Sequence, residues 1–431
     1  MAISVHDDLR RARYLRLGGC YLRPNMERRL RRQVEGQAQS ATSFRFATYC
    51  PHVPPATPDK ELGVHHEIES TALWSIGTAV PTFQFSQQKA LTYALSCIPP
   101  AIARHVKFLY RRSQIDSRHT CSQALYNAIE LDTGEAAGDE ASTAERMQAY
   151  ESQAADLAAR AAKRALAQAP HFSAADITHL VMVTCTGFVS PGPDVLLFEQ
   201  LGLRSDVRRV QVGFMGCHGA MNGLHTAAAI CRSEPQAVVV VASLELCTLH
   251  FQSTLTEENL VITSLFSDGA AAALLSGKAF TDGQPRCYLD AFGSRVYPEA
   301  RDAIAWRVGN QGFDMGLALS NAHDLRPLIP DFVGDWLSSY ELHQDDIDLW
   351  AIHPGGRAVL DTCEWALGFA PDALASSRWV LRHYGNMSSP TILFVMDHLL
   401  AKTKANRVRR GLSLGFGPGV TLEGILWHEG D

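Results

Sequence analysis

The residues best suited to covalent chemistry lie in the segment VQVGFMGCHGAMNGLHTAAAIC, which runs from Val210 to Cys231. Its first part is apolar and predicts a strand, and its last part is rich in small residues and predicts a helix. Cys217 lies at the turn between them. A thiol at a helix N-terminus faces unpaired N–H groups and the positive end of the helix dipole, which favour the thiolate. The pattern therefore indicates a nucleophile, with a buried structural cysteine as the alternative.

A cysteine nucleophile needs a base or a cation nearby, and His353 is the main candidate. It ends the apolar run DLWAI and precedes Pro-Gly-Gly, which predicts a position at the carboxyl end of a strand, where α/β folds place their sites. His218 is the weaker alternative, because neighbours at a helix start diverge by about 100°. Asn386, in HYGNMSSP, is a candidate hydrogen-bond donor to a thioester oxygen. A helix cap is the alternative interpretation of Asn386.

An α/β framework is expected to position these side chains. Residues 72–81, 176–187 and 237–246 are apolar runs of strand length, and the last two lack polar alternation, as in strands covered on both faces. Residues 143–169 and 219–233 predict helices, so the local order is β-α-β. The sequence therefore predicts a sheet flanked by helices.

The C-terminal part repeats this order. DIDLWAIHPGG (346–356) resembles DITHLVMVTCTG (176–187), since each has Asp-Ile, an apolar run and a turn with a polar residue. Helices are expected next at 357–368 and 391–404, before a closing hairpin at 412–427. Two similar halves predict an internally duplicated α/β fold, and chance similarity of two buried strands is the alternative.

Composition and charge limit the classes of function. The chain has 431 residues and a net charge of −6, which argues against a nucleic-acid partner. No apolar run approaches the roughly 20 residues of a membrane-spanning helix. None of the ten cysteines has C-x-x-C or zinc-site spacing. We therefore expect no metal site and a cytoplasmic enzyme acting on small molecules.

The predicted domain organisation has three parts. Residues 1–68 are rich in arginine and then in proline, and we expect a partly mobile extension, with a docking arm as the alternative. Residues 69–290 form the expected N-terminal half with the nucleophile. Residues 291–431 form the expected C-terminal half with the histidine and the asparagine.

Four separated motifs resemble those of one family. GFMGCHGAMNGL, AIHPGGRAVLD, YGNMSSPTILFVM and LGFGPGVTLEGILW are similar, in this order, to the nucleophile, histidine, asparagine and C-terminal signatures of the type III polyketide synthases, the chalcone-synthase-like enzymes. LYRRSQIDSRH and SLFSDGAAAALL extend the resemblance. WRVGNQGFDMGLALS resembles the bacterial and fungal alkylresorcinol and alkylpyrone synthases in particular.

The resemblance implies a fold, a catalytic triad and a reaction. It implies an α/β thiolase fold of five layers, αβαβα, a homodimer, and a triad of Cys217, His353 and Asn386. Cys217 would load an acyl-CoA starter and extend it by iterative decarboxylative condensation with malonyl-CoA, followed by cyclisation to alkylpyrones or alkylresorcinols. CoA thioesters are the implied substrates, with no further cofactor. A fatty-acid synthase or an acyl carrier protein is an alternative starter donor.

The resemblance also assigns a substrate pocket. Phe266 and Phe313 match the gate between the CoA tunnel and the cavity, with core packing as the alternative, and Arg112 matches a basic position that contacts CoA. The other implied pocket residues are Cys185, Thr186, Cys247, His250, Ala358, Ser388, Gly415, Phe416, Gly417, Pro418 and Gly419. Several of them depart from the threonines of the plant enzymes. Smaller groups there would open an acyl tunnel, so a fatty acyl starter is expected.

Two other interpretations compete with this one. A ketoacyl-ACP synthase of type III shares the triad but performs a single condensation on a carrier protein, has its histidine and asparagine in different local sequences, and lacks the GFGPG ending. A non-catalytic acyl-binding scaffold could keep the fold. The presence of all three triad residues argues against the scaffold.

Overall fold

The computed structural model describes residues 69–131, 141–252, 256–280, 283–317, 325–370, 372–402 and 407–430. The predicted N-terminal extension, 1–68, lies outside these residues. One mixed sheet of nine strands runs through the described part, in the order β11-β12-β13-β8-β1-β7-β6-β4-β5.

The first half of the sheet contains the strands expected at 72–81, 176–187, 237–246 and before Cys217, together with one strand that was not predicted, β7. Its strands are β1 (Thr71–Ala79), β7 (Asp268–Ser276), β6 (Val238–Leu246), β4 (His179–Thr184) and β5 (Arg208–Gly213). Every residue of β6 is buried, because helices cover both of its faces. β4 pairs in parallel with both β5 and β6, which requires the crossover helices α7 (Pro193–Leu201) and α8 (Gly219–Ser233).

The second half of the sheet holds the remaining four strands, which are β8 (Cys287–Val296), β13 (Thr421–Glu429), β12 (Arg409–Gly417) and β11 (Leu349–Ile352). β12 and β13 form the expected hairpin, and β11 lies parallel to β12. β1 and β8 join the two halves through three residue pairs that include Thr71 with Leu289. The predicted boundary between the N-terminal and C-terminal halves of the chain, at residue 290, falls inside β8. This boundary stays a prediction.

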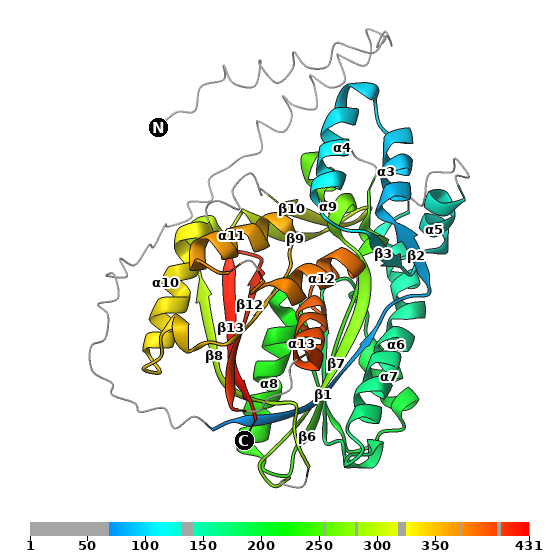
Figure 1. Ribbon diagram of the computed structural model, residues 1–431. Coiled ribbons are helices and arrows are strands. Elements are labelled where there is room, and N and C mark those ends of the chain that lie inside the picture. The colour runs from blue at the N-terminus through cyan, green and yellow to red at the C-terminus, as the bar shows by residue number, and fades with distance from the viewer. Residues whose placement is uncertain are drawn as a thin grey trace, which may run out of the picture. The chain divides into compact units, whose positions relative to one another are not determined.

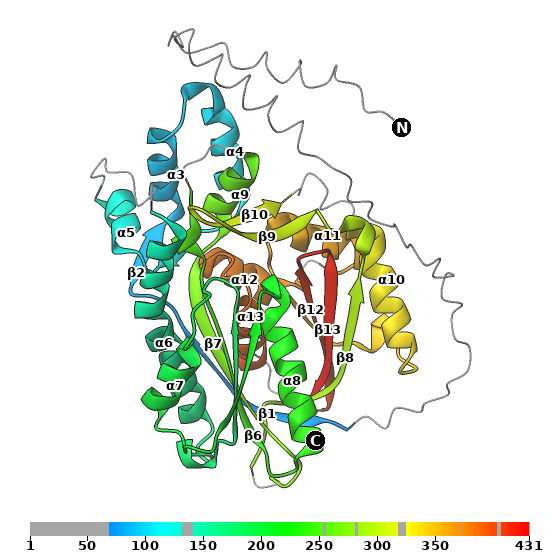
Figure 2. The ribbon, with the colours of Figure 1, turned by 180° about the vertical axis from the view of Figure 1, so that it is seen from behind.

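Helices form three layers around the two half-sheets (Figures 1 and 2). α6 (Thr143–Gln168) covers the outer face of the first half beside α7. α8 and α13 (Thr391–Lys402) lie between the halves, since α8 contacts β4, β6 and β13, and α13 contacts β1, β7, β11 and β12. α10 (Leu325–Ser338) and α11 (Arg357–Leu367) cover the outer face of the second half. The order is αβαβα, as expected.

Shorter elements surround one end of these layers. The helices are α3 (Gln87–Ser96), α4 (Ala103–Arg112), α5 (Gln123–Glu130), α9 (Glu257–Leu265) and α12 (Ala375–Tyr384). The strands are the pair β2 (Phe83–Ser86) and β3 (Ser117–Thr120) and the hairpin β9 (Ile304–Gly309) and β10 (Gly312–Leu317). No described helix is both long enough and apolar enough to cross a membrane.

The start of the long helix α6 is set by its own sequence, and the helix packs closely against strand β1. A capping box formed by Ser142 and Glu145 begins it. Its buried face is made mostly of alanines, which lets the helix backbone approach β1 at Gly77. A Cβ added at Gly77 would lie 2.3 Å from both the carbonyl oxygen of Ala161 and the nitrogen of Ala165. Glycine at this position therefore sets the spacing between helix and sheet.

Replacement of Gly77 by alanine should lower the free energy of unfolding by about 3 kcal/mol, because the new methyl group meets backbone atoms that cannot move aside. Gly334→Ala is the matched control, since Gly334 lies inside α10 and a Cβ there has no neighbour within 4 Å. That control should gain about 0.5 to 1 kcal/mol from helix propensity. Urea denaturation measures both, and equal stabilities for the two variants would contradict the close approach.

Candidate active site

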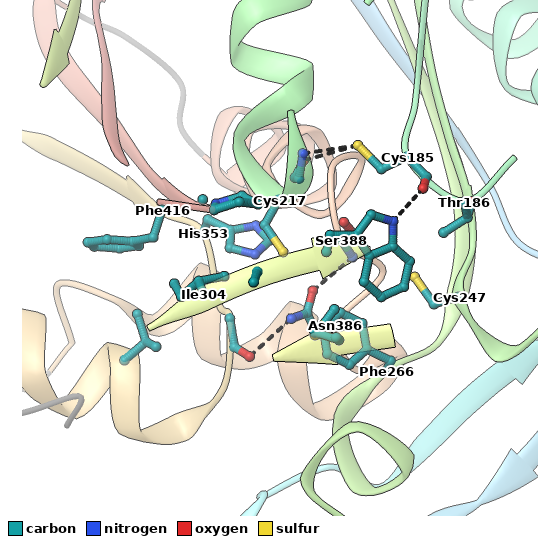
Figure 3. A pocket seen from close by; sticks show the side chains of 18 of the residues that line it. Cys185, Thr186, Cys217, Cys247, Phe266, Ile304, His353, Asn386, Ser388 and Phe416 are labelled. Atoms are coloured by element: carbon teal, nitrogen blue, oxygen red, sulfur yellow. Dashed lines mark hydrogen bonds between the residues drawn. The ribbon is translucent and has the colours of Figure 1, made fainter. Parts of the chain in front are cut away.

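A cavity of about 70 Å³ lies where β4, β5 and β11 end, and both halves of the chain contribute to its wall. Of the predicted site residues, the following line it: Cys185, Thr186, Cys217, Cys247, Phe266, His353, Asn386, Ser388, Phe416, Gly417 and Pro418. Figure 3 shows the side chains of Cys217, His353 and Asn386 directed into the same space. Three groups that are far apart in the sequence therefore meet at one cavity.

A tight turn between β5 and α8 places Cys217 at the cavity. Phe214 and Gly216 in this turn have positive φ angles of 56° and 75°, and the short 3-10 helix Gly216–His218 leads directly into α8. Glycine is favoured at position 216 by its φ angle, and also because a Cβ there would lie 2.2 Å from Cδ of Pro418. The sulfur thus lies at the first turn of a helix, where unpaired N–H groups favour negative charge.

His353 enters the cavity directly after β11. Its main-chain N–H donates to the carbonyl oxygen of Leu414 on β12 at 2.8 Å, which extends the strand pairing by one residue. The residue is 1% exposed, and neither ring nitrogen has a hydrogen-bond partner among the residues described. Buried polar atoms are normally paired, so this imidazole is available to a thiol or a substrate. Figure 3 shows the Cys217 sulfur beside its ring.

The amide of Asn386 is held by two main-chain contacts. Its Nδ2 donates to the carbonyl oxygen of Gly355 at 3.0 Å, and its Oδ1 accepts from the N–H of Ser388 at 2.8 Å. An amide nitrogen carries two hydrogens, so the second N–H can bond in the cavity, where a hydrogen bond from Asn386 lowers the pKa of the Cys217 thiol. Both contacts lie outside α13, so they do not make Asn386 a cap of that helix.

Burial disfavours the charged form of both Cys217 and His353. It raises the pKa of the Cys217 thiol to about 11 and lowers the pKa of the His353 imidazole to about 3. Transfer of the thiol proton to the imidazole would create two opposite charges side by side, which offset each other's loss of hydration. This arrangement suits His353 to accept the proton of Cys217.

Six predicted site residues do not line the cavity. They are Arg112, His250, Phe313, Ala358, Gly415 and Gly419. Arg112 is exposed on α4, with its guanidinium 5.4 Å from the ring centroid of Phe108. Ala358 is exposed at the start of α11, and its neighbour Val359 borders the cavity instead.

Of the two predicted gate residues, only Phe266 lines the cavity, and the gate itself stays a prediction. Phe266 borders the cavity, but Phe313 stacks on His250 with ring centroids 4.2 Å apart, and its N–H donates to His250 Nδ1 at 3.1 Å. Met315, two residues along β10, lines the cavity. His218, the alternative base, contacts Asn222 Oδ1 through Nδ1 at 2.6 Å and is absent from the described cavity wall.

Two further residues were not found from the sequence. Trp306 on β9 lines the cavity, and its Nε1 donates to the carbonyl oxygen of Cys185 at 2.7 Å. Alternation along β9, which puts Ile304 and Trp306 on one face, was the available signal. Glu245 is fully buried behind the wall and accepts hydrogen bonds from the Cys185 N–H and from Thr186 Oγ1. Burial raises the pKa of its carboxyl to about 7.

Two family models match nearly all of the chain that the structure describes. The model of chalcone and stilbene synthases, N-terminal domain, matches residues 64–279, and that of the C-terminal domain matches residues 290–429. The chain belongs to the chalcone and stilbene synthase family. It is a type III polyketide synthase, an acyltransferase that catalyses iterative condensation.

Relatives and solved structures agree with this family. Alpha-pyrone synthesis polyketide synthase-like Pks18 of Mycobacterium tuberculosis is 32% identical over 77% of this chain and 84% of its own length. Type III polyketide synthase 21 of Oryza sativa subsp. japonica is 30% identical over 82% of this chain and 92% of its own. The C-terminal type III domain of Steely1 from Dictyostelium superimposes with a TM-score of 0.78 at 28% identity, covering 84% of this chain and 99% of that domain. The expected thiolase fold is therefore confirmed.

Substitution of His353 by glutamine should make alkylation of Cys217 depend steeply on pH. Without the imidazole, the thiol keeps the pKa of about 11 that burial imposes, and its alkylation rate should rise about tenfold per pH unit between pH 6 and 9. The wild-type rate should be higher at pH 6 to 7 and flatter. Iodoacetamide labelling of Cys217, followed by mass spectrometry, measures both profiles.

His225→Gln is the control for this measurement, because His225 lies further along α8, where its ring stacks on Phe292, and it is not part of the described cavity wall. It should keep the wild-type profile. Identical profiles for wild type and His353→Gln would show that His353 is not the proton acceptor.

Proposed function

We propose that Cys217, His353 and Asn386 form the catalytic triad of this polyketide synthase, with CoA thioesters as donors of the starter and of the extender units. The observation that supports this most directly is the meeting of a thiol, an imidazole with two unpaired nitrogens and an oriented amide at one buried cavity.

In the loading step, the Cys217 sulfur attacks the carbonyl carbon of the starter thioester while His353 takes the thiol proton. The bond from carbon to the CoA sulfur breaks, and the CoA thiolate leaves with the proton from His353. The acyl group stays on Cys217 as a thioester. The N–H groups at the start of α8 lie beside the reacting sulfur and favour the negative charge that develops there.

In the extension step, malonyl-CoA binds with its thioester oxygen between His353 and Asn386. Loss of CO2 leaves an electron pair that moves to this oxygen as an enolate, and each residue donates one N–H to it. One such donor is typically worth about 3 kcal/mol in the transition state. The enolate carbon then attacks the acyl carbon on Cys217 and releases the sulfur, and the extended β-ketoacyl-CoA can load again.

The starter we propose is a fatty acyl group, with alkylpyrones or alkylresorcinols as products. Support comes from the small side chains of Cys185, Thr186, Cys247 and Ser388 in the cavity wall and from similarity to Pks18, whose name refers to alpha-pyrone synthesis. The cavity of about 70 Å³ is smaller than the roughly 300 Å³ at the lower end of ordinary ligand pockets. A long chain therefore requires a wall residue such as Trp306 to move.

The working form that we propose is a cytoplasmic homodimer, because CoA thioesters and reduced thiols are found together in the cytoplasm. β5 lies at the edge of the sheet with most of its residues exposed, and Phe188 beside it is 76% exposed. A second copy of the chain would cover this edge. An acyl carrier protein as starter donor stays a prediction from the sequence.

Replacement of Cys217 by glutamine should abolish acyl loading and leave decarboxylation measurable, because His353 and Asn386 remain in place. Intact-mass spectrometry after incubation with a fatty acyl-CoA detects the adduct, and conversion of malonyl-CoA to acetyl-CoA reports decarboxylation. Cys97→Ala, at an exposed cysteine, should load like the wild type. An acyl adduct on the Cys217→Gln variant would assign the nucleophile to another residue.

Replacement of Cys247 by phenylalanine should shorten the longest starter that is accepted, because the added ring occupies the cavity. Trp306→Ala should have the opposite effect, because it removes the largest side chain from the wall. Product analysis with acyl-CoA starters of increasing length measures both. An unchanged length profile for both variants would place the acyl chain elsewhere.

A further inference from the structure

A fully buried arginine lies behind the cavity, on β3. Arg118 is 1% exposed, and no carboxylate of the described residues lies within salt-bridge distance of it. Its Nη1 donates to the carbonyl oxygens of Thr263 and Phe266 at 2.7 and 2.8 Å, and its Nε donates to Gln87 Oε1 at 2.9 Å. The guanidinium also lies 4.9 Å from the ring centroid of Phe85.

Burying the guanidinium of Arg118 with these contacts costs free energy, so a role for the residue has to be sought. A buried cation loses its hydrogen bonds to water. Around Arg118, uncharged carbonyl oxygens take the place of the water. Thr263 is in the last turn of α9 and Phe266 follows that helix, so the carbonyls that face Arg118 are those at the negative end of the α9 dipole. Arg118 thereby fixes the path of the chain from α9 to Phe266.

The segment held by Arg118 is paired with the segment that carries Asn386. Phe266 and Asn386 form a parallel β-bridge, in which the Asn386 N–H donates to the Leu265 carbonyl oxygen and the Ser267 N–H donates to the Asn386 carbonyl oxygen, each at 2.9 Å. Figure 3 shows the side chains of Phe266 and Asn386 next to each other at the cavity.

Arg118 touches the second segment directly as well. Gly385, just before Asn386, has a φ of 70°, and a Cβ there would lie 3.0 Å from Cγ of Arg118. The aliphatic stem of Arg118 therefore packs against one segment while its guanidinium binds the other. Cys217 is carried by the turn from β5 to α8, and His353 follows β11, so neither belongs to these two segments.

We infer that Arg118 is a positioning residue for decarboxylation of the extender unit, because it holds Phe266 and Asn386 in register with each other and leaves the position of Cys217 unaffected. The inference rests on the proposed role of Asn386 as a donor to the malonyl thioester oxygen. It predicts a larger effect on extension than on loading, because the Asn386 amide binds the extender thioester, whereas in loading it acts only through its hydrogen bond to the Cys217 thiolate, which lowers the thiol pKa by less than burial raises it.

The substitution Arg118→Lys tests this inference, because lysine keeps the positive charge but lacks the planar set of N–H donors of the guanidinium. We expect kcat for decarboxylation of malonyl-CoA to fall about 100-fold, as for a donor displaced by about 1 Å, with acylation of Cys217 slowed by less than about threefold. Arg232→Lys is the matched control, because Arg232 Nη2 also donates to main-chain carbonyls, those of Leu289 and Asp290 on β8, away from the cavity. It should leave both rates unchanged.

A purely structural role would slow both half-reactions together, and that result, or two unchanged rates, would overturn the inference. Gln87→Met removes one acceptor of Arg118 and tests the same contact if the lysine variant does not fold. It should lower decarboxylation alone. Absence of decarboxylation in the wild-type protein would instead refute the proposed function, so the two failures are distinguishable.

Discussion

The packing of α8 and α13 between the two half-sheets is the constraint on which the site depends. α8 begins just after Cys217, and α13 begins five residues after Asn386. Because both helices are buried against strands on two sides, their N-terminal ends cannot shift independently. β11 contributes His353 from the second half-sheet at the same end. The cavity is thus where the central helix layer meets the ends of strands from both halves.

Burial gives this site its electrostatic character. Burial in this cavity penalises a lone thiolate and a lone imidazolium, as the pKa directions of Cys217 and His353 show. The same low polarity strengthens any hydrogen bond made to charge that develops during a reaction. The unpaired ring nitrogens of His353 are buried at an energetic cost, which a hydrogen bond to a thioester oxygen would offset.

Sequence patterns were most informative where the chemistry and the secondary structure are local. The strand-to-helix turn at Cys217 and the strand end at His353 follow from apolar runs, glycines and small helix-forming residues, and the structure has both. The cavity wall was harder to predict, because Phe313 and Met315 are two residues apart on β10 and the sequence pattern does not say which of them reaches the cavity. Contacts with His250 occupy Phe313. Trp306 was missed for a similar reason, because its role depends on what lies opposite β9.

The sequence alone determined the family, the alternation of strands and helices, and the local settings of the three proposed catalytic residues, because each of these is encoded within a short stretch of chain. Only the tertiary structure decided which side chains share a wall, how large the cavity is, and that a buried arginine on β3 connects Phe266 with Asn386. These features depend on contacts between residues more than 100 positions apart. Such contacts are set by packing of whole layers, which no local pattern records.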